Sequence, residues 1–305
     1  MNFFATSDLV GIDSELDIEV PQYSCLKCIN EVERNNAISI FLTVDSFRKN
    51  RDFLNSTMEK LNPSVPCSLF IGFSEGKNFK LSEIPQQSLA RIKQVYLENL
   101  EEAHSKALPL PIGFRDGKEK RPSNFPMSER LYIDIIKQDN SKKDMRILLS
   151  FSPWTHPSRI DALNLSDKHP IFYSPNIDGK KRVYKLPTGD IPPKSYFYNL
   201  GRFKFALSPR GGGLDTHRFY ECIAKGTLPM VLRTNSSFDF IYQQFPSLVL
   251  NNWEEILEDV SELQHIYDNF LIQRNKLLMN FPNFSIDARN ISEFYTKSYG
   301  LSTNV

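Results

Sequence analysis

The stretch Phe203–Leu232, FKFALSPRGGGLDTHRFYECIAKGTLPMVL, places a strand pattern, a glycine-rich turn, a helix pattern and a second strand pattern in direct succession. Phe203–Leu207 and Leu228–Leu232 are apolar runs of strand length, and Asp215–Lys225 between them has a helical period. A strand, a helix and a strand in this order are typical of a parallel sheet with helical connections. The stretch therefore predicts an α/β fold.

The turn between this strand and this helix combines features that suit a bound diphosphate. The glycines Gly211–Gly213 allow positive φ and remove side chains, so another molecule can approach the backbone. Asp215-Thr216 predicts a helix N-cap, and the exposed N–H groups of the helix start attract anions. Arg210 from the loop and Arg218 from the helix add two guanidinium groups.

Glu221 follows Arg218 by one helical turn and could accept hydrogen bonds from the two vicinal hydroxyls of a ribose. The alternative is an ordinary ion pair between Arg218 and Glu221 on the surface of a helix that follows a tight turn. The stretch contains neither the Walker A sequence nor the Gly-x-Gly-x-x-Gly dinucleotide fingerprint. From the residues alone, the diphosphate site and the surface ion pair both remain open.

The N-terminal half repeats the alternation of strands and helices. Strands are predicted over Ala37–Val44, Cys67–Phe73 and Ala107–Phe114, and helical patterns cover Phe47–Leu61 and Gln87–Ser105. This series is typical of a second parallel sheet. The polar stretch 115–144 is the predicted linker between the halves.

The C-terminal half continues the series on both sides of Phe203–Leu232. Further strands are predicted over Arg146–Phe151, Ile171–Ser174, Val183–Leu186 and Ser247–Leu250, and further helices over His156–Leu163, Trp253–Asn275 and Ile286–Ser298. The predicted fold class is α/β, with two domains and a cleft between them. They span residues 1–130 and 131–285, and a helix over 286–305 could pack back on the N-terminal domain.

Composition and charge narrow the function classes. The 305 residues contain 37 Lys+Arg and 36 Asp+Glu, which gives a net charge of +1. Such a balanced charge does not indicate general binding to nucleic acids or membranes. No stretch reaches the ~18–20 apolar residues of a transmembrane helix, and the N-terminus lacks the features of a secretory signal peptide. Four cysteines, with one Cys-x-x-Cys pair at Cys25 and Cys28, indicate neither a disulfide scaffold nor a complete zinc site. We expect a cytoplasmic protein.

The sequence from Ser208 to Pro229 resembles the signature of the exostosin-like glycosyltransferases, which reads roughly S-P-R-G-x-G-x-D-x-x-R-x-x-E-A-x-x-x-G-x-I-P-V. It departs from that signature at Gly212, where Asn is usual, at Tyr220, where Trp is usual, and at Cys222, where Ala is usual. Weaker matches are Phe151–Arg159, with His156 for the family's Asn, Phe41–Asp45, Tyr96–Asn99 before Pro111–Gly113, and Trp253.

The resemblance implies a GT-B fold, with two Rossmann-like domains facing a cleft, and an inverting transfer. The donor would be a UDP-sugar, such as UDP-xylose, UDP-galactose or UDP-glucuronic acid, bound on the C-terminal domain. The acceptor would be a hydroxyl of an oligosaccharide or glycan, bound mainly on the N-terminal domain. No cofactor and no metal are expected, because two arginines and helix N–H groups can offset the charge of the leaving diphosphate. The chain resembles the short forms without a membrane anchor that occur in bacteria and large DNA viruses.

The resemblance also assigns residues to the site. The predicted donor-binding residues are Ser208, Arg210, Gly211, Gly212, Gly213, Asp215, Thr216, Arg218 and Glu221. Further cleft candidates are Thr155, His156, Arg159 and Asn99.

The general base is the least defined part of the site. An inverting displacement needs a proton acceptor near the acceptor hydroxyl. Asp45 follows the first predicted strand and Glu75 the second, and the carboxyl ends of strands face the ligand in open α/β sheets. We slightly favour Glu75, because related sequences often have Ser-Asp there. The alternative for each is a solvated loop carboxylate, and His156 is expected to donate or accept a hydrogen bond in the cleft.

Two other functions stay open. One is a fucosyltransferase-like GT-B enzyme that uses a GDP-sugar. The other is a catalytically inactive module that binds a nucleotide-sugar or a glycan. Such a module would be expected to lose Arg218 or Glu221, and both are present, which disfavours it.

Overall fold

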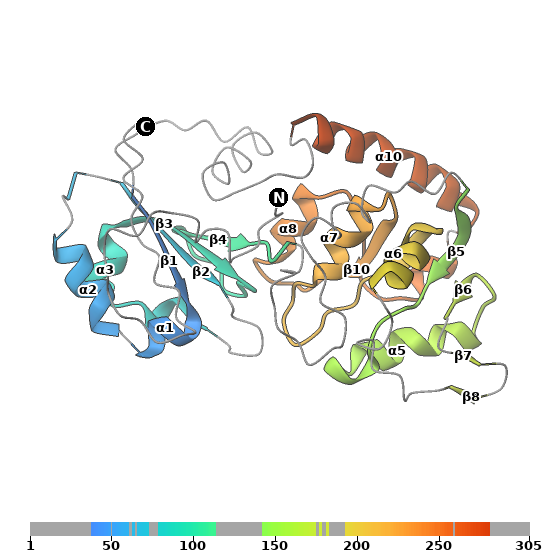
Figure 1. Ribbon diagram of the computed structural model, residues 1–305, viewed down its shortest axis with the longest axis horizontal. Helices are drawn as coiled ribbons and strands as arrows, with labels where there is room; N and C mark the ends of the chain where they lie inside the picture. Colours follow the sequence, from blue (N-terminus) through green and yellow to red (C-terminus); the bar gives the residue numbers. More distant parts are fainter. Residues whose placement is uncertain are drawn as a thin grey trace. The chain divides into compact units, whose positions relative to one another are not determined.

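The computed structural model describes residues 38–49, 51–60, 63–64, 66–72, 79–113, 142–174, 177–178, 181–182, 193–258 and 260–280. These residues form a mixed α/β structure with two parallel sheets, of four and five strands (Figure 1). They divide into two compact units. The N-terminal unit comprises described residues of 38–112 and 235–241, and the C-terminal unit those of 113–234 and 242–280.

The N-terminal unit contains a four-stranded sheet in the order β1-β2-β3-β4, with all neighbours parallel. Because each step along this sheet goes in the same direction, right-handed crossovers place the connecting helices on one face. Its elements are β1 (Ile38–Thr43), α1 (Val44–Lys49), α2 (Arg51–Lys60), β2 (Cys67–Gly72), the 3-10 turn η2 (Leu81–Glu83), α3 (Gln86–Arg91), β3 (Ile92–Glu98) and β4 (Ala107–Leu110).

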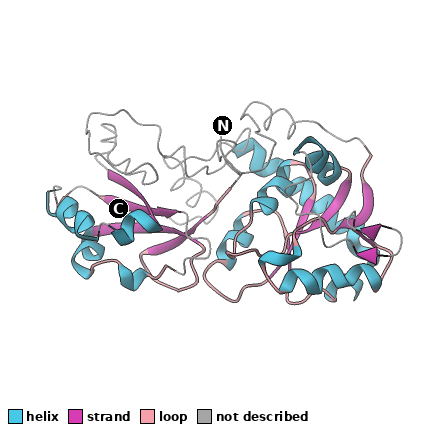
Figure 2. Cartoon of the chain, turned by 60° about the horizontal axis from the view of Figure 1, so that its bottom comes forward, coloured by secondary structure: helices cyan, strands magenta, loops and turns pink. Residues whose placement is uncertain are grey.

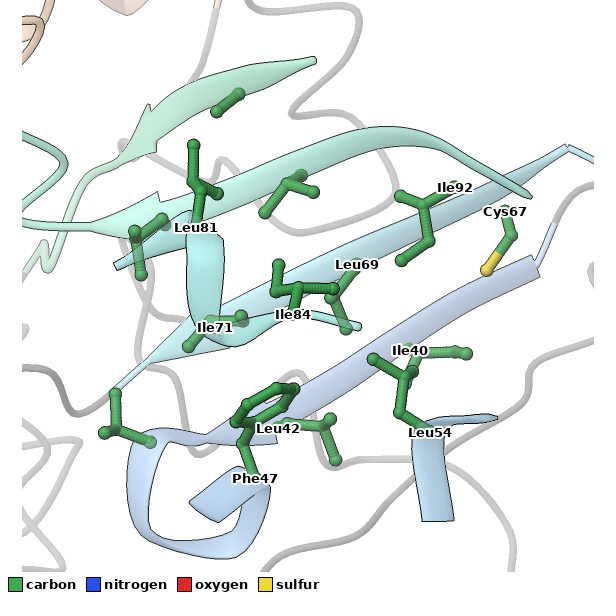
Figure 3. Close-up of a cluster of buried hydrophobic side chains, with 14 of the residues drawn as sticks. Ile40, Leu42, Phe47, Leu54, Cys67, Leu69, Ile71, Leu81, Ile84 and Ile92 are labelled. Atoms are coloured by element: carbon green, nitrogen blue, oxygen red, sulfur yellow. The ribbon is translucent and has the colours of Figure 1, made fainter. Parts of the chain in front are cut away.

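The helices and one face of this sheet enclose a hydrophobic core (Figure 3). Phe47 of α1 lies beside Leu42 of β1, and Leu54 of α2 lies beside Ile40, with all four side chains buried. Burial of each such side chain stabilises the fold by about 1.5–3 kcal/mol. The thiol of Cys67 lies in the same core, and burial raises its pKa to about 11.

The helix predicted over Gln87–Ser105 is wrong for most of its length. The short helix α3 is followed directly by strand β3, which pairs with β2 and β4. Val95 is buried in the core, while Tyr96 on the opposite face stacks on Phe70 with 4.7 Å between ring centres. A parallel strand buried on both faces has no polar alternation, so its apolar residues can imitate a helical period.

The C-terminal unit contains a five-stranded sheet in the order β11-β10-β9-β5-β6, again with all neighbours parallel. Figure 2 shows its helices packed around the strands. The strands are β5 (Asp144–Leu148), β6 (Phe172–Tyr173), β9 (Phe203–Leu207), β10 (Leu228–Leu232) and β11 (Leu248–Leu250), and β7 (Ile177–Asp178) pairs separately with β8 (Lys181–Arg182). The helices of this part of the chain are η3 (Pro153–Thr155), α5 (Ser158–Asn164), η4 (Leu165–Asp167), α6 (Pro193–Gly201), α7 (His217–Ala224), α8 (Asp239–Gln244), α9 (Glu255–Glu258), η6 (Val260–Glu262) and α10 (Leu263–Asn280).

The chain leaves β5 and β9, which are neighbours in this sheet, in opposite directions. It passes from β5 to β6 on one side and from β9 to β10 on the other. Right-handed crossovers then place α5 and α7 on opposite faces. In open α/β sheets, ligands bind beyond the carboxyl ends of the strands at such a switch point. Loops 149–157 and 208–216 begin at this point.

Most predicted elements of the C-terminal half are confirmed. The strands Phe203–Leu207 and Leu228–Leu232 have the predicted bounds, whereas the predicted helix Trp253–Asn275 is divided into α9, η6 and α10. Helices α6 and α8 were not predicted. Val183–Leu186, Ile286–Ser298, the division at residue 130, and the pair Cys25 and Cys28 lie outside the described residues. Within the described part of the chain, no helix combines the length and apolar character needed to cross a membrane.

Helix α7 ends in a Schellman motif centred on Gly226. Gly226 has φ +64° and donates its N–H to the carbonyl of Ile223 at 3.1 Å. The N–H of Thr227 donates to the carbonyl of Cys222 at 2.9 Å, which completes the motif. Arg274 of α10 adds a bond from Nε to the carbonyl of Ile223 at 2.6 Å. These bonds fix the position of α7 from its C-terminal end.

Replacing Gly226 by alanine is expected to lower the free energy of unfolding by about 1–3 kcal/mol, because a residue with a Cβ is strained at positive φ. Gly226→Asn should cost less, because asparagine adopts the left-handed conformation more readily. Guanidinium chloride unfolding of the wild type and both variants measures the difference. An alanine variant as stable as the wild type would contradict this role of Gly226.

Candidate functional site

Arg159, in the first turn of α5, holds the glycine-rich loop after β9. Its Nε donates to the carbonyl of Arg210 at 2.8 Å, and its Nη2 donates to the carbonyl of Pro209 at 3.2 Å. Its Nη1 donates to the carbonyl of Ser152, in the loop after β5, at 3.1 Å. One planar guanidinium therefore ties together the two loops at the switch point. Arg159 was predicted as a cleft residue. Its contacts show that it holds the two loops together through their backbone carbonyls.

Gly211 packs directly against Arg159. A Cβ at this position would lie 3.1 Å from Nη2 of Arg159 and 3.8 Å from Oγ1 of Thr155. The first distance is shorter than ordinary van der Waals contact, so a side chain would displace a guanidinium that three hydrogen bonds hold. Positive φ occurs at Gly113 and Gly226 among the described glycines, so Gly211–Gly213 do not use the positive φ that glycine allows. Gly211 is needed for close approach and not for an unusual backbone conformation.

The start of α7 is fixed by Asp215 and Thr216. Thr216 occupies the N-cap position, but its side chain makes no cap bond and its Oγ1 lies 3.0 Å from Oγ of Ser208. The carboxylate of Asp215 is buried and accepts bonds from the N–H of Thr216 and the hydroxyl of Tyr220, both at 2.7 Å. The first turn of α7 is therefore held in place without a side-chain cap on its N–H groups.

Arg210 and Arg218 each have a buried N–H without a partner in the part of the chain that the structure describes. These atoms are Nε of Arg210 and Nη1 of Arg218. Cζ of Arg218 lies 5.3 Å from the ring centre of Tyr196 and 5.7 Å from that of Phe151. Leaving a buried donor unpaired costs about 1–3 kcal/mol, and more for a charged group. An anion that accepted both hydrogen bonds would remove this cost.

Glu221 does not pair with Arg218 among the described residues, so the predicted alternative of a surface ion pair is not formed. The carboxylate of Glu221 is only 7% exposed, and its Oε2 accepts the hydroxyl of Tyr196 at 2.7 Å. Burial raises the pKa of Tyr196 well above its usual value, against the opposing effect of Arg218 and with support from Glu221. The hydroxyl therefore stays protonated and donates to Glu221.

Tyr196 is a site residue that the sequence analysis missed. It lies on α6, whose only sequence signal is the short apolar-aromatic run of Pro193–Gly201. Nothing in that run indicates that one tyrosine hydroxyl binds a carboxylate on α7, because the contact depends on how α6 and α7 pack.

His156 lies beside Arg210 and Arg159 and is suited to donating a hydrogen bond. Its Nδ1 accepts the N–H of Ser158 at 3.2 Å and lies 2.8 Å from Oγ of Ser158. Nδ1 therefore carries no proton, which places the proton of the neutral ring on Nε2. Burial lowers the pKa of His156, and the charges of Arg210 and Arg159 lower it further. A neutral ring with a protonated Nε2 suits contact with a ligand oxygen better than proton abstraction.

The lowered pKa of His156 predicts a specific pH dependence of stability. In the unfolded chain its pKa is about 6.5. Below that pH the unfolded state binds more protons than the folded state, so the free energy of unfolding decreases as the pH falls. His156→Asn should therefore lose less stability than the wild type between about pH 7.5 and pH 5.

Thermal unfolding across this pH range measures the effect, with His265→Asn, at an exposed position of α10, as the control that should follow the wild type. Parallel pH profiles of the wild type and the His156 variant would contradict the assignment.

The remaining candidates lie in different parts of the chain. Asp45 is exposed in the first turn of α1, directly after β1, and Asn99 follows β3 with φ 54°. Thr155 is exposed on η3, beside Gly211. Glu75 lies outside the described residues, so the choice of base stays a prediction.

No protein-family model matches the chain, and no curated protein matches it. The resemblance to the exostosin-like glycosyltransferases therefore rests on the motif from Ser208 to Pro229 and on the weaker matches around it.

Arg218→Met tests whether Arg218 serves the fold or a ligand. Methionine fills a similar volume and removes the unpaired N–H, so we expect the free energy of unfolding to change by less than about 1 kcal/mol, or to rise. Arg202→Met is the matched control, because Arg202 is exposed just before β9, at the end of the strand away from the glycine loop. Denaturant unfolding measures both. A loss above about 3 kcal/mol for Arg218→Met would make Arg218 a structural residue.

Proposed function

We propose that the protein is an inverting glycosyltransferase that transfers a sugar from a UDP-sugar to a hydroxyl of a glycan. The observation that carries the proposal is the pair of arginines, Arg210 and Arg218, whose buried N–H groups have no partner among the described residues. They flank a glycine-rich loop and a helix start at the switch point of a parallel sheet. These are the features that a diphosphate requires.

In this proposal the diphosphate of the donor binds against loop 208–216. Its oxygens accept charge-assisted hydrogen bonds from Nε of Arg210 and Nη1 of Arg218, and they face the first turn of α7. Gly211 lets the ligand approach the backbone. Glu221, fixed by the hydroxyl of Tyr196, accepts hydrogen bonds from the ribose hydroxyls.

The proposed reaction is a single displacement. The acceptor oxygen attacks the anomeric carbon while the bond from that carbon to the diphosphate oxygen breaks, which inverts the configuration. The leaving diphosphate takes the electron pair, and the two guanidinium groups and the helix N–H groups stabilise its charge. The acceptor proton passes to a carboxylate, for which Asp45 and Glu75 are the candidates. Because the protein supplies positive charge at the leaving group, the mechanism requires no metal ion.

The decisive experiment measures nucleotide affinity by calorimetry for the wild type, Arg218→Met and the control Arg202→Met. Arg218→Met should weaken UDP binding by about tenfold to a hundredfold, because it removes a charged hydrogen-bond donor from a phosphate. The control should bind UDP like the wild type. GDP should bind more weakly than UDP, and stronger GDP binding would favour the GDP-sugar alternative.

Release of UDP from UDP-sugars in the presence of oligosaccharides then separates an enzyme from a binding module. Binding without any release would favour the catalytically inactive module. If neither UDP nor GDP binds the wild type, the proposal is wrong.

A further inference from the structure

Trp154 is an exposed aromatic residue in the loop after β5, two residues before His156, which lies near Arg159 and Arg210. Trp154 is 65% exposed, whereas the neighbouring Pro153 and Phe151 are buried. The segment is therefore anchored in the unit while the indole remains accessible. A single exposed apolar residue is normal on a protein surface. Exposure alone therefore does not indicate a binding role for Trp154, and its position relative to the site is the relevant evidence.

Contacts on both sides of Trp154 hold this segment against the glycine-rich loop. Thr155 is one of the groups nearest to Gly211, with 3.8 Å between its Oγ1 and the position of a Cβ there. Arg159 binds the carbonyls of Ser152 and of the loop residue Arg210. The indole is thus carried by a short segment in which Phe151 and Pro153 are buried and Thr155 lies beside Gly211.

The contacts of the site follow one another in a series. Glu221 binds the hydroxyl of Tyr196, and the ring of Tyr196 lies 5.3 Å from Cζ of Arg218. The ring of Phe151 lies 5.7 Å from Cζ of Arg218 and 5.8 Å from Cζ of Arg159. Arg159 in turn donates a hydrogen bond to the carbonyl of Ser152, two residues before Trp154. A nucleotide-sugar has the same order of parts: ribose, diphosphate, sugar.

We propose that the indole of Trp154 is the platform on which the sugar ring of the donor stacks. The inference rests on the proposed function, which places the ribose at Glu221 and the diphosphate at Arg210 and Arg218. A pyranose presents an apolar face of C–H groups, which packs against an exposed indole and removes both surfaces from water. Nε2 of His156 and the hydroxyl of Thr155 lie on the same segment and can bind the hydroxyl groups at the edge of the ring.

The chain has two tryptophans, so removing the other one lets the fluorescence of Trp154 report on its own environment. Trp253 is 4% exposed, and its Nε1 has no partner among the described residues, so Trp253→Phe removes a buried unpaired donor. In the Trp253→Phe variant, all tryptophan fluorescence comes from Trp154. Quenching by acrylamide then measures the exposure of this one side chain. Acrylamide is neutral, whereas iodide would be attracted to the arginines.

We expect at least one of UDP-glucose, UDP-galactose, UDP-xylose and UDP-glucuronic acid to protect Trp154 from acrylamide, while UDP alone leaves the quenching unchanged. Trp154→Ala should weaken the binding of that UDP-sugar about tenfold and leave UDP affinity unchanged. Trp154→Phe should retain most of the affinity. Tyr198→Ala is the matched control, because Tyr198 is an exposed aromatic residue of the same unit that packs on Arg202.

The outcomes separate this inference from the proposed function. If UDP binds but no UDP-sugar protects Trp154, and Trp154→Ala leaves the affinities unchanged, the platform is wrong while the nucleotide site stands. Equal protection by UDP and by a UDP-sugar would place the uracil against the indole and would also overturn the inference. If neither UDP nor any UDP-sugar binds the wild type, the proposed function and the platform fail together.

Discussion

The candidate site depends on the three hydrogen bonds from Arg159 to backbone carbonyls. These bonds join the loop after β5 to the loop after β9, the two loops that begin at the switch point of the sheet. They also bring Arg159 close to His156 and Arg210. Positive groups gathered in this way repel one another, and the carbonyl oxygens bound by Arg159 offset part of that repulsion. The same guanidinium lies 3.1 Å from the position of a Cβ at Gly211, so a side chain there would require it to shift.

Further hydrogen bonds in the C-terminal unit hold helix α7 at both ends. Helix α7 is held at its C-terminal end by the Schellman motif and Arg274, and at its start by the bonds of Asp215 to Thr216 and Tyr220. Between these ends, Arg218 presents a donor that no described group satisfies. A site prepared in this way gains its missing hydrogen bonds only when an acceptor binds.

Two sequence patterns were ambiguous for a common physical reason. The false helix over Gln87–Ser105 arose because β3 is buried on both faces, which removes the alternation that marks a strand. The alternative of an ion pair between Arg218 and Glu221 assumed an exposed helix face, but Glu221 is buried and accepts a hydrogen bond from Tyr196 of α6. In each case the sequence pattern was compatible with two environments, and the neighbouring element selected one of them.

The sequence by itself determined the alternation of strands and helices, the bounds of β9 and β10, and the grouping of Arg210, Gly211 and Arg218 around one turn. These features depend on local hydrophobic period and on spacing along a single βαβ unit. The tertiary structure decided which residues, distant in the sequence, form hydrogen bonds with one another. Tyr196 and Glu221 are 25 residues apart, and Arg159 and Arg210 are 51 residues apart. Contacts at such separations depend on the order of strands and the packing of helices across the sheet, because local backbone preferences do not act over that distance.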